Sequence, residues 1–195
     1  MIVPIVEGLA EVESVPLLLR RILADGQLEH IQVARPFRVK RNQIVREGEL
    51  ERAMEQAIRD REHARCGLVL MDSDDDCAAG LGRSLLNRAT QVTALPVAVI
   101  LAVRELEAWF LGAKESLRGI RGIRGDATVP ADPENIRGAK ERLTRNMETG
   151  RRYLDVDDQP AFAQSIDISA TLLQCPSFDK FIRDFHRLIH ASRAL

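Results

Sequence analysis

The 195-residue sequence has few cysteines, few aromatic residues and no long apolar run. Its three cysteines, Cys66, Cys77 and Cys175, are odd in number and lack metal-ligand spacing. They indicate free thiols in a reducing compartment rather than a disulfide framework or a zinc site. No segment approaches the roughly 20 apolar residues that span a bilayer, and the chain does not start like a signal peptide. We therefore expect a cytoplasmic protein with no membrane partner.

The composition also lacks a charge imbalance. The chain carries 28 basic and 29 acidic residues, for a formal net charge of -1. Overall charge therefore neither favours nor excludes a polyanionic partner. With one Trp and one Tyr, the chain has few aromatic side chains on which the bases of a single-stranded nucleic acid could stack. A hydrophobic content of 45% is ample for the core of one domain.

Apolar runs alternate with segments of helical periodicity over the first half of the chain. Strands are predicted over residues 1–8, 31–37, 66–72 and 95–103, with helices over residues 9–26, 48–63 and 78–90. This alternation is typical of crossover units, so the sequence predicts an α/β fold with a mainly parallel sheet of about four strands. Helices on both faces of the sheet would make three layers, α/β/α.

The pattern changes after Trp109. Residues 112–133 are rich in Gly and Arg and predict an irregular excursion, and helical segments follow over residues 133–147, 159–174 and 177–192. We divide the chain into an α/β core over residues 1–112 and a loop with a helical extension over residues 113–195. No Pro- or Ser-rich linker separates the two parts, so the extension is expected to pack on the same domain.

Carboxylates gather where strands are predicted to end. The stretch "VLMDSDDDC" places Asp72, Asp74, Asp75 and Asp76 directly after an apolar strand, and Glu7 ends the first strand. Ligands of open α/β sheets bind at the carboxyl ends of the strands. Hard cations such as Mg²⁺ are bound by a few carboxylates plus water and substrate phosphate. The pattern favours a metal site, whereas helix capping and solvation are the alternative for the exposed aspartates.

Three other ligand-binding motifs do not match the sequence. The spacing of Asp72, Asp74 and Asp76 begins like an EF-hand loop, but Cys77 replaces the turn glycine and Arg83 the bidentate glutamate. The first strand is followed by neither a phosphate-binding loop ending in Gly-Lys-Ser/Thr nor a GxGxxG motif. An EF-hand is therefore rejected, and neither a P-loop nor a classical dinucleotide site is expected.

"IVPIVEG" together with "LVLMDSDDDC" resembles the TOPRIM fold of topoisomerases, primases and small nucleases. The stretches "VRELEAWFLGAKESL", "PENIRGAKERL" and "CPSFDKF" extend the likeness to the bacterial TOPRIM-like family catalogued as domain of unknown function family 4276. The ordered set of motifs covers nearly the whole chain and is more specific than the acidic pair alone. Members of that family are often encoded near ATPases, with suspected roles in phage defence.

The TOPRIM resemblance implies roles for named residues. Glu7 would be the general acid/base, and Asp72 and Asp74 would bind Mg²⁺ or Mn²⁺ together with Glu7. Asp76 and Glu11 are implied as further metal ligands or as groups that support them, although Glu11 also suits a solvated helix N-terminus. The activity implied is cleavage of a phosphodiester bond in DNA or RNA, and of the two we favour DNA. This nuclease assignment is inherited from a fold.

Further candidates lie outside these motifs. Glu105 and Glu107 follow the fourth strand and could complete the acidic site, or could be exposed acids at a helix start. Four basic residues are candidates for holding phosphate: Arg104, Arg121, Arg124 and Lys140. Solvated arginines on a surface loop and an exposed helical lysine are the plainer interpretations for the last three.

The sequence thus predicts a metal-dependent nuclease, and the near-neutral charge suggests that a partner ATPase supplies recognition. The alternative is a catalytically silent TOPRIM-like module that binds or regulates a partner. A phosphotransfer receiver is a third hypothesis, but its acidic pair would follow the first strand, where this chain has Glu-Gly.

Overall fold

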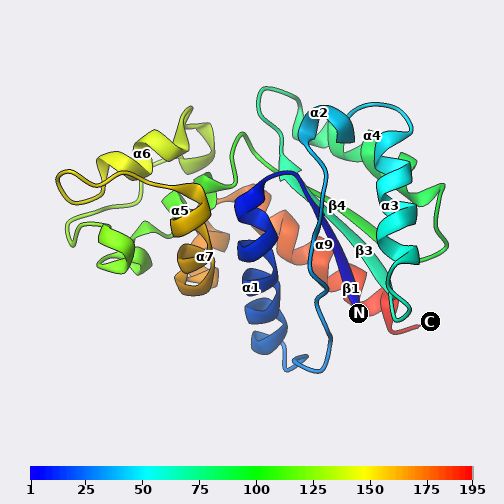
Figure 1. The fold of residues 1–195 in the computed structure, drawn as a ribbon. Helices are drawn as coiled ribbons and strands as arrows, with labels where there is room; N and C mark the ends of the chain where they lie inside the picture. Colours follow the sequence, from blue (N-terminus) through cyan, green and yellow to red (C-terminus); the bar gives the residue numbers. More distant parts are fainter. Residues whose placement is uncertain (195) are drawn as a thin grey trace.

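A parallel sheet of four strands organises the first half of the chain (Figure 1). The computed structural model describes residues 1–194. The strands lie in the order β2-β1-β3-β4, and every neighbouring pair is parallel. Their bounds are β1 Ile2–Val6, β2 Phe37–Arg38, β3 Cys66–Asp72 and β4 Val97–Ala102. The predicted α/β class with C-terminal helices is confirmed, and the sheet is parallel throughout.

The second strand is shorter than predicted. Residues 31–37 were expected to be extended, but β2 contains only Phe37 and Arg38, and Val33 forms an isolated parallel bridge with Ile2. Pro36 lies between these two contacts and has no N–H to donate, so it interrupts the ladder at this edge. The segment therefore follows β1 while pairing with it only at intervals.

Helices cover both faces of the sheet. Successive side chains of each strand point to opposite faces, and both faces are apolar. Ile2 and Leu68 point toward α1 (Leu9–Asp25) and α9 (Pro176–Ser192), whereas Val3 and Val69 point the other way. The second face is covered by α3 (Glu49–Arg59) and α4 (Ala78–Thr90), and the short α2 (Arg41–Ile44) lies at the rim (Figure 1). The strands are almost completely buried, as expected for a sheet covered on both faces.

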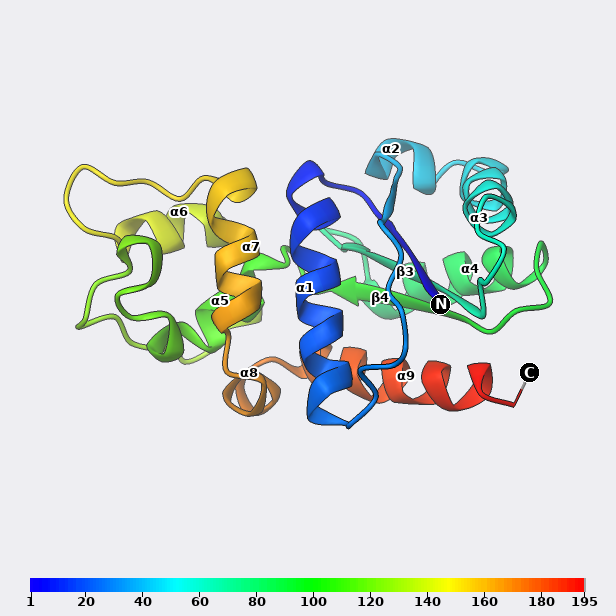
Figure 2. The ribbon, with the colours of Figure 1, turned by 60° about the horizontal axis from the view of Figure 1, so that its bottom comes forward.

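The rest of the chain forms a helical extension beside α1 (Figure 2). Its helices are α5 (Glu107–Gly112), α6 (Ala139–Arg145), α7 (Asp155–Ser165) and α8 (Ile168–Gln174). Helix α7 lies along α1, and the extension shares one continuous apolar core with α1 and α9. Trp109 is fully buried in that core and stacks on Phe181 of α9, with ring centroids 5.4 Å apart.

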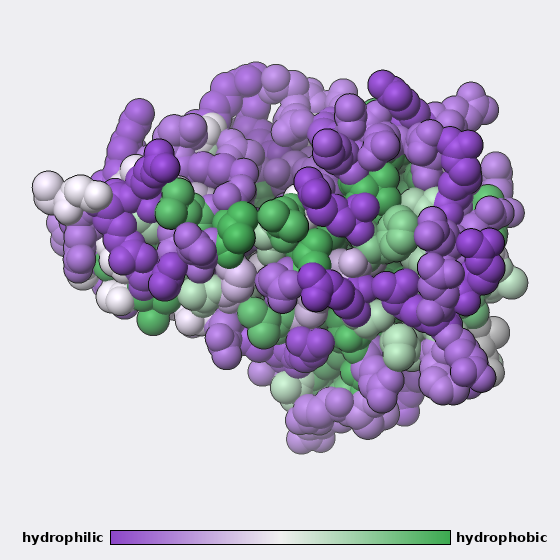
Figure 3. Space-filling view, viewed as in Figure 1, coloured by the Kyte–Doolittle hydropathy of each residue, from purple (hydrophilic) through white to green (hydrophobic). Residues whose placement is uncertain are grey.

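The surface is largely polar. On the face drawn in Figure 3, hydrophilic side chains predominate, and apolar ones gather in a band across the middle. No helix within residues 1–194 is long and apolar enough to cross a membrane. Cys66, Cys77 and Cys175 are free thiols, as predicted.

Candidate active site at the carboxyl ends of the strands

Glu7 and Asp72 meet because β1 and β3 are neighbours in register. Val6 pairs with Leu70, so the residues that follow each strand leave the sheet at the same edge. The Asp72 amide donates a hydrogen bond of 3.1 Å to Glu7 Oε1. Glu7 Oε2 is buried and has no hydrogen-bond partner among the residues described. Burial raises the pKa of Glu7, and the nearby Asp74 charge adds to this rise.

Asp72 connects this point to the loop after β4. Its Oδ1 accepts a hydrogen bond of 2.7 Å from the Leu106 amide. Burial raises the pKa of Asp72 well above its usual range, and the neighbouring carboxylates of Glu107, Glu7 and Glu11 raise it further. Three carboxylates from other parts of the chain therefore lie close enough to repel the charge of Asp72.

Glu11 enters the site from the first turn of α1. Its carboxylate accepts a hydrogen bond from the Gly8 amide and closes the start of the helix. Only 7% of Glu11 is exposed, and burial together with Glu7 and Glu107 raises its pKa to about 7. A Cβ at Gly8 would lie 2.7 Å from Glu11 Oε1, so a side chain at this position would displace the Glu11 carboxylate.

Glu107 is the most enclosed of these acids, with 1% exposed. Its Oε1 accepts hydrogen bonds from the Tyr153 hydroxyl at 3.0 Å and from Gln159 Nε2 at 3.3 Å. The Gln159 amide oxygen in turn accepts from the Ser14 hydroxyl at 2.6 Å. This chain of polar contacts joins α5, α7 and α1. Tyr153, Gln159 and Ser14 were not predicted, because nothing in their local sequence marks them as polar core residues.

We call Glu7, Glu11, Asp72 and Glu107 the buried acidic cluster, in which Glu11 and Glu107 are buried and Glu7 and Asp72 are half-buried. Lys140 lies beside it, with Nζ 3.8 Å from Glu107 Oε1 and 3.7 Å from an oxygen of Asp155. Its positive charge lowers the pKa values of Glu7 and Glu11 and partly offsets their burial. Within the described chain, no three His, Cys, Asp or Glu side chains are arranged as a ready metal-binding group.

The aspartates that follow Asp72 form ion pairs with arginines instead of joining this cluster. Arg41 Nε lies 2.6 Å from Asp74 Oδ2, and Arg41 Nη2 lies 2.6 Å from Asp76 Oδ2. Arg41 also donates to the carbonyl oxygen of Ser73 at 3.1 Å. More than half of the Asp74 and Asp76 side chains is exposed. The structure therefore places Asp74 near Glu7 but in an ion pair with Arg41, with Asp76 on the same guanidinium.

Two residues with left-handed backbones hold the adjacent loops together. Asp74 has φ 49° and Arg104 has φ 61°, and the Asp74 amide donates to the Arg104 carbonyl at 3.0 Å. Non-glycine residues adopt this conformation only where the surroundings impose it, and such residues gather at functional sites. The Arg104 amide also donates to the Ser73 hydroxyl at 2.9 Å. These two hydrogen bonds join the loop after β3 to the loop after β4.

A small cavity of about 140 Å³ lies on these loops. Asp75 forms ion pairs there with Arg104 at 3.3 Å and with Arg137 at 2.8 Å. Arg104 Nε is buried without a partner in the described residues. Glu105 lines the cavity and accepts a hydrogen bond from the Ala139 amide at 3.1 Å, so it closes the start of α6.

The remaining phosphate-binding candidates have protein partners. Arg121 Nε lies 2.8 Å from Oδ1 of the buried Asp158, which also pairs with Arg151. Arg124 Nε lies 2.9 Å from Asp126. In the described chain neither arginine forms an ion pair with the buried acidic cluster, whereas Lys140 lies beside Glu107.

Together, the fold and the cluster define an α/β protein with buried acids at the carboxyl edge of a parallel sheet. More particularly, the chain belongs to the family described as "Domain of unknown function (DUF4276)", whose model matches residues 6–186. The comparisons with curated proteins and with solved structures found no match.

Proposed function

We propose that this protein is a TOPRIM-like phosphodiesterase that uses Mg²⁺ or Mn²⁺ to cleave nucleic acid, DNA rather than RNA. One observation carries the proposal: Glu7, directly after β1, has a buried oxygen without a hydrogen-bond partner, while its other oxygen accepts from the amide of Asp72 at the end of β3. A carboxylate oxygen left without hydrogen bonds is costly, unless a ligand completes its partners.

The donor chemistry fits a hard divalent cation. Such ions take carboxylate oxygens and water, and a cation would offset the burial and the repulsion that together raise the pKa values of Glu7 and Asp72. Glu7 and Asp72 would hold the ion, with Glu11 and Asp76 as further candidates. Asp74 would join them only by leaving Arg41. The ion would polarise the phosphate and stabilise the leaving oxygen.

The protein groups have separate tasks in this proposal. Glu7 is suited to move a proton because its raised pKa brings it closer to neutral pH. Lys140 lies between the cluster and solvent, 46% exposed, where it can contact a substrate phosphate. Arg104 and Arg137 face Asp75 across the small cavity and could exchange that carboxylate for a phosphate.

The biological setting is proposed from the family resemblance. A formal net charge of -1 supplies little general affinity for duplex DNA, so a partner ATPase would supply recognition. We place this pair in the cytoplasm, in a phage-defence system.

A silent binding or regulatory module is the second candidate. It is favoured by Arg41, because an arginine that neutralises Asp74 and Asp76 occupies the position that a cation would take. In a module of this kind the acids would serve only to join the loops after β3 and β4.

The test is nicking of supercoiled plasmid by the purified protein with Mg²⁺ or Mn²⁺, beside Glu7→Gln, Asp72→Asn and an EDTA control. Asp126→Asn is the matched control, since it removes an exposed carboxylate in the extension that pairs with Arg124. We expect nicking by the wild type and by Asp126→Asn only. Calorimetric titration with Mg²⁺ separates the candidates further, because a silent module would neither nick nor bind the ion.

A further inference from the structure

The outer edge of the sheet is open. Strand β4 pairs with β3 on one side and is the last strand in the order, so its other side has no strand partner. The ladder to β3 starts with the Gly67 amide donating to the Pro96 carbonyl and ends with the Ser73 amide donating to the Ala102 carbonyl. Even-numbered residues of β4 therefore bond to β3. The odd-numbered residues Val97, Val99 and Leu101 point their N–H and C=O groups outward.

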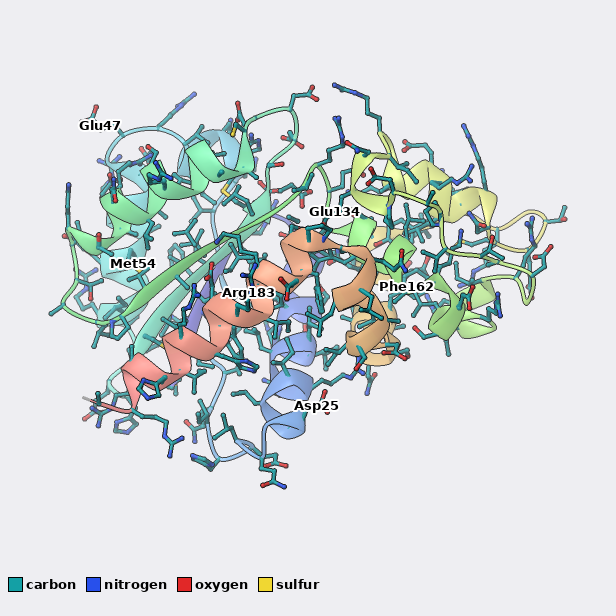
Figure 4. The ribbon with its side chains drawn as sticks, turned by 180° about the vertical axis from the view of Figure 1, so that it is seen from behind. Asp25, Glu47, Met54, Glu134, Phe162 and Arg183 are labelled. Atoms are coloured by element: carbon teal, nitrogen blue, oxygen red, sulfur yellow. The ribbon has the colours of Figure 1, made fainter. Side chains whose placement is uncertain are left out.

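This edge is the floor of a groove of about 720 Å³. One wall is α4, which contributes Ala79 and Leu86, and the other is α9, which contributes Leu188. Figure 4 shows β4 running between these two helices. Natural sheets usually cover or blunt an edge of this kind, because unpaired backbone groups recruit further strands. Here no strand of the described chain pairs with the edge, which lies at the bottom of a mainly apolar groove, with Val99 and Leu101 only 6% and 7% exposed.

The charges on the walls favour an acidic occupant. Arg83 on α4 forms no recorded ion pair in the described chain, while Lys180 and Arg187 on α9 share the single carboxylate of Asp184. Glu134 also lines the groove, but it is buried and bonded to Ser177 at the start of α9. The cations of the groove therefore exceed its free anions.

We propose that this groove, formed by β4 between α4 and α9, binds an extended acidic segment of a partner protein that adds a fifth strand to the sheet. Main-chain hydrogen bonds to Val97, Val99 and Leu101 supply affinity, and the apolar walls with their cations select the side chains. A second copy of this chain is a worse fit. It would bring the same excess of positive charge against itself.

The test uses a fluorescein-labelled synthetic peptide with four central valines and two glutamates at each end. Fluorescence anisotropy measures its binding to the full chain. Ala79→Trp fills the groove from an exposed position, and Asn87→Trp is the matched control, exposed on the same helix outside the groove. We expect Ala79→Trp to weaken binding at least about tenfold. Asn87→Trp should bind like the wild type, and circular dichroism checks that both variants fold.

Two further readouts test the mode of binding. The peptide should protect the amides of Val97, Val99 and Leu101 from hydrogen exchange. A version with lysines in place of glutamates should bind more weakly. The proposal is overturned by absence of saturable binding, by equal binding to Ala79→Trp, or by equal binding of the lysine peptide. It is also overturned if light scattering finds a dimer that Ala79→Trp converts to a monomer, since the occupant would then be a second copy.

Discussion

The acidic residues at the carboxyl edge of the sheet form two groups that differ in burial and in partners. In the first group, Glu11 and Glu107 are buried and Glu7 and Asp72 are half-buried; burial raises the pKa of each, and repulsion from other members of the group adds to the rise for Glu11 and Asp72. Asp74, Asp75 and Asp76 lie in the following loop, exposed, and each forms an ion pair with an arginine. Neighbouring aspartates of one sequence motif therefore have opposite environments.

This contrast distinguishes the acids that are suited to chemistry from those that position the loop. Surface ion pairs contribute little to stability, typically below about 1 kcal/mol, because water and salt screen them. Carboxylates buried together oppose folding when ionised, so a protein retains them where binding or catalysis uses them. The buried acidic cluster is thus where function is expected, and the exposed aspartates position the loop above it.

The largest effect is expected when one acid of each group is neutralised and nuclease activity is measured. Asp72→Asn should lower the rate of metal-dependent nicking by about 10²-fold or more, as loss of a group essential to the chemistry does. Asp75→Asn, which removes the ion pairs of an exposed carboxylate with Arg104 and Arg137, should change the free energy of unfolding by only about 0.5 to 1 kcal/mol. It should keep most of the activity. Equal losses in both variants would show that the contrast in burial has no functional meaning.

The next effect concerns stability in the absence of metal. The pKa of Glu11 is raised from 4.5 to about 7 in the folded protein, so folding favours its protonated form. That contribution is fully present below about pH 4.5 and is lost as pH rises through about 7. Glu11→Gln keeps an oxygen for the Gly8 amide and carries no charge.

Chemical denaturation at pH 5 and pH 8 in EDTA measures this effect. We expect Glu11→Gln to match the wild type at pH 5 and to be more stable at pH 8, by up to about 3 kcal/mol. A difference that does not change with pH would contradict the assigned environment of Glu11. Glu13→Gln is the control, since Glu13 is exposed on the same helix.

The third effect is a loss of stability, expected where an interior contact of Glu107 is removed. Tyr153→Phe deletes the hydroxyl that donates to Glu107 Oε1 and leaves the ring packed on Phe162. The free energy of unfolding should fall by about 1 to 3 kcal/mol at pH 7, because a buried carboxylate loses a donor. Thermal unfolding measures it. No change would indicate that Lys140 and Gln159 alone satisfy Glu107.

The smallest effect is expected from the arginine that joins the two groups. Arg41→Gln releases Asp74 and Asp76 and removes a positive charge near Glu7. We expect Mg²⁺ affinity to rise about fivefold, close to 1 kcal/mol, in a calorimetric titration. Arg41→Lys keeps the charge and should bind the ion like the wild type. Weaker binding by Arg41→Gln would mean that Arg41 orders the metal ligands rather than competing with the metal.

Much of this architecture could be predicted from local patterns. Runs such as residues 66–72 are continuously apolar because both faces of their strand are covered, and that signal needs no knowledge of neighbours. The position of Glu7 and Asp72 at the ends of two such runs predicts that they share one edge of the sheet, because parallel strands end at one edge. That they meet also depends on β1 and β3 being neighbours, which the sheet order supplies. Residues 31–37 were predicted poorly, since Pro36 breaks a pairing that composition alone suggested.

The sequence by itself determined the α/β class, the succession of strands and helices along the chain and the position of acids at strand ends, because these depend on periodicity and on chain direction. The tertiary structure alone decided which acids are buried. Arg41, Tyr153 and Gln159 reach the site from distant segments, and their contacts depend on how α2 and α7 pack rather than on any nearby residue. The open edge of β4 was also decided there, since only the strand order reveals which strand lacks a neighbour.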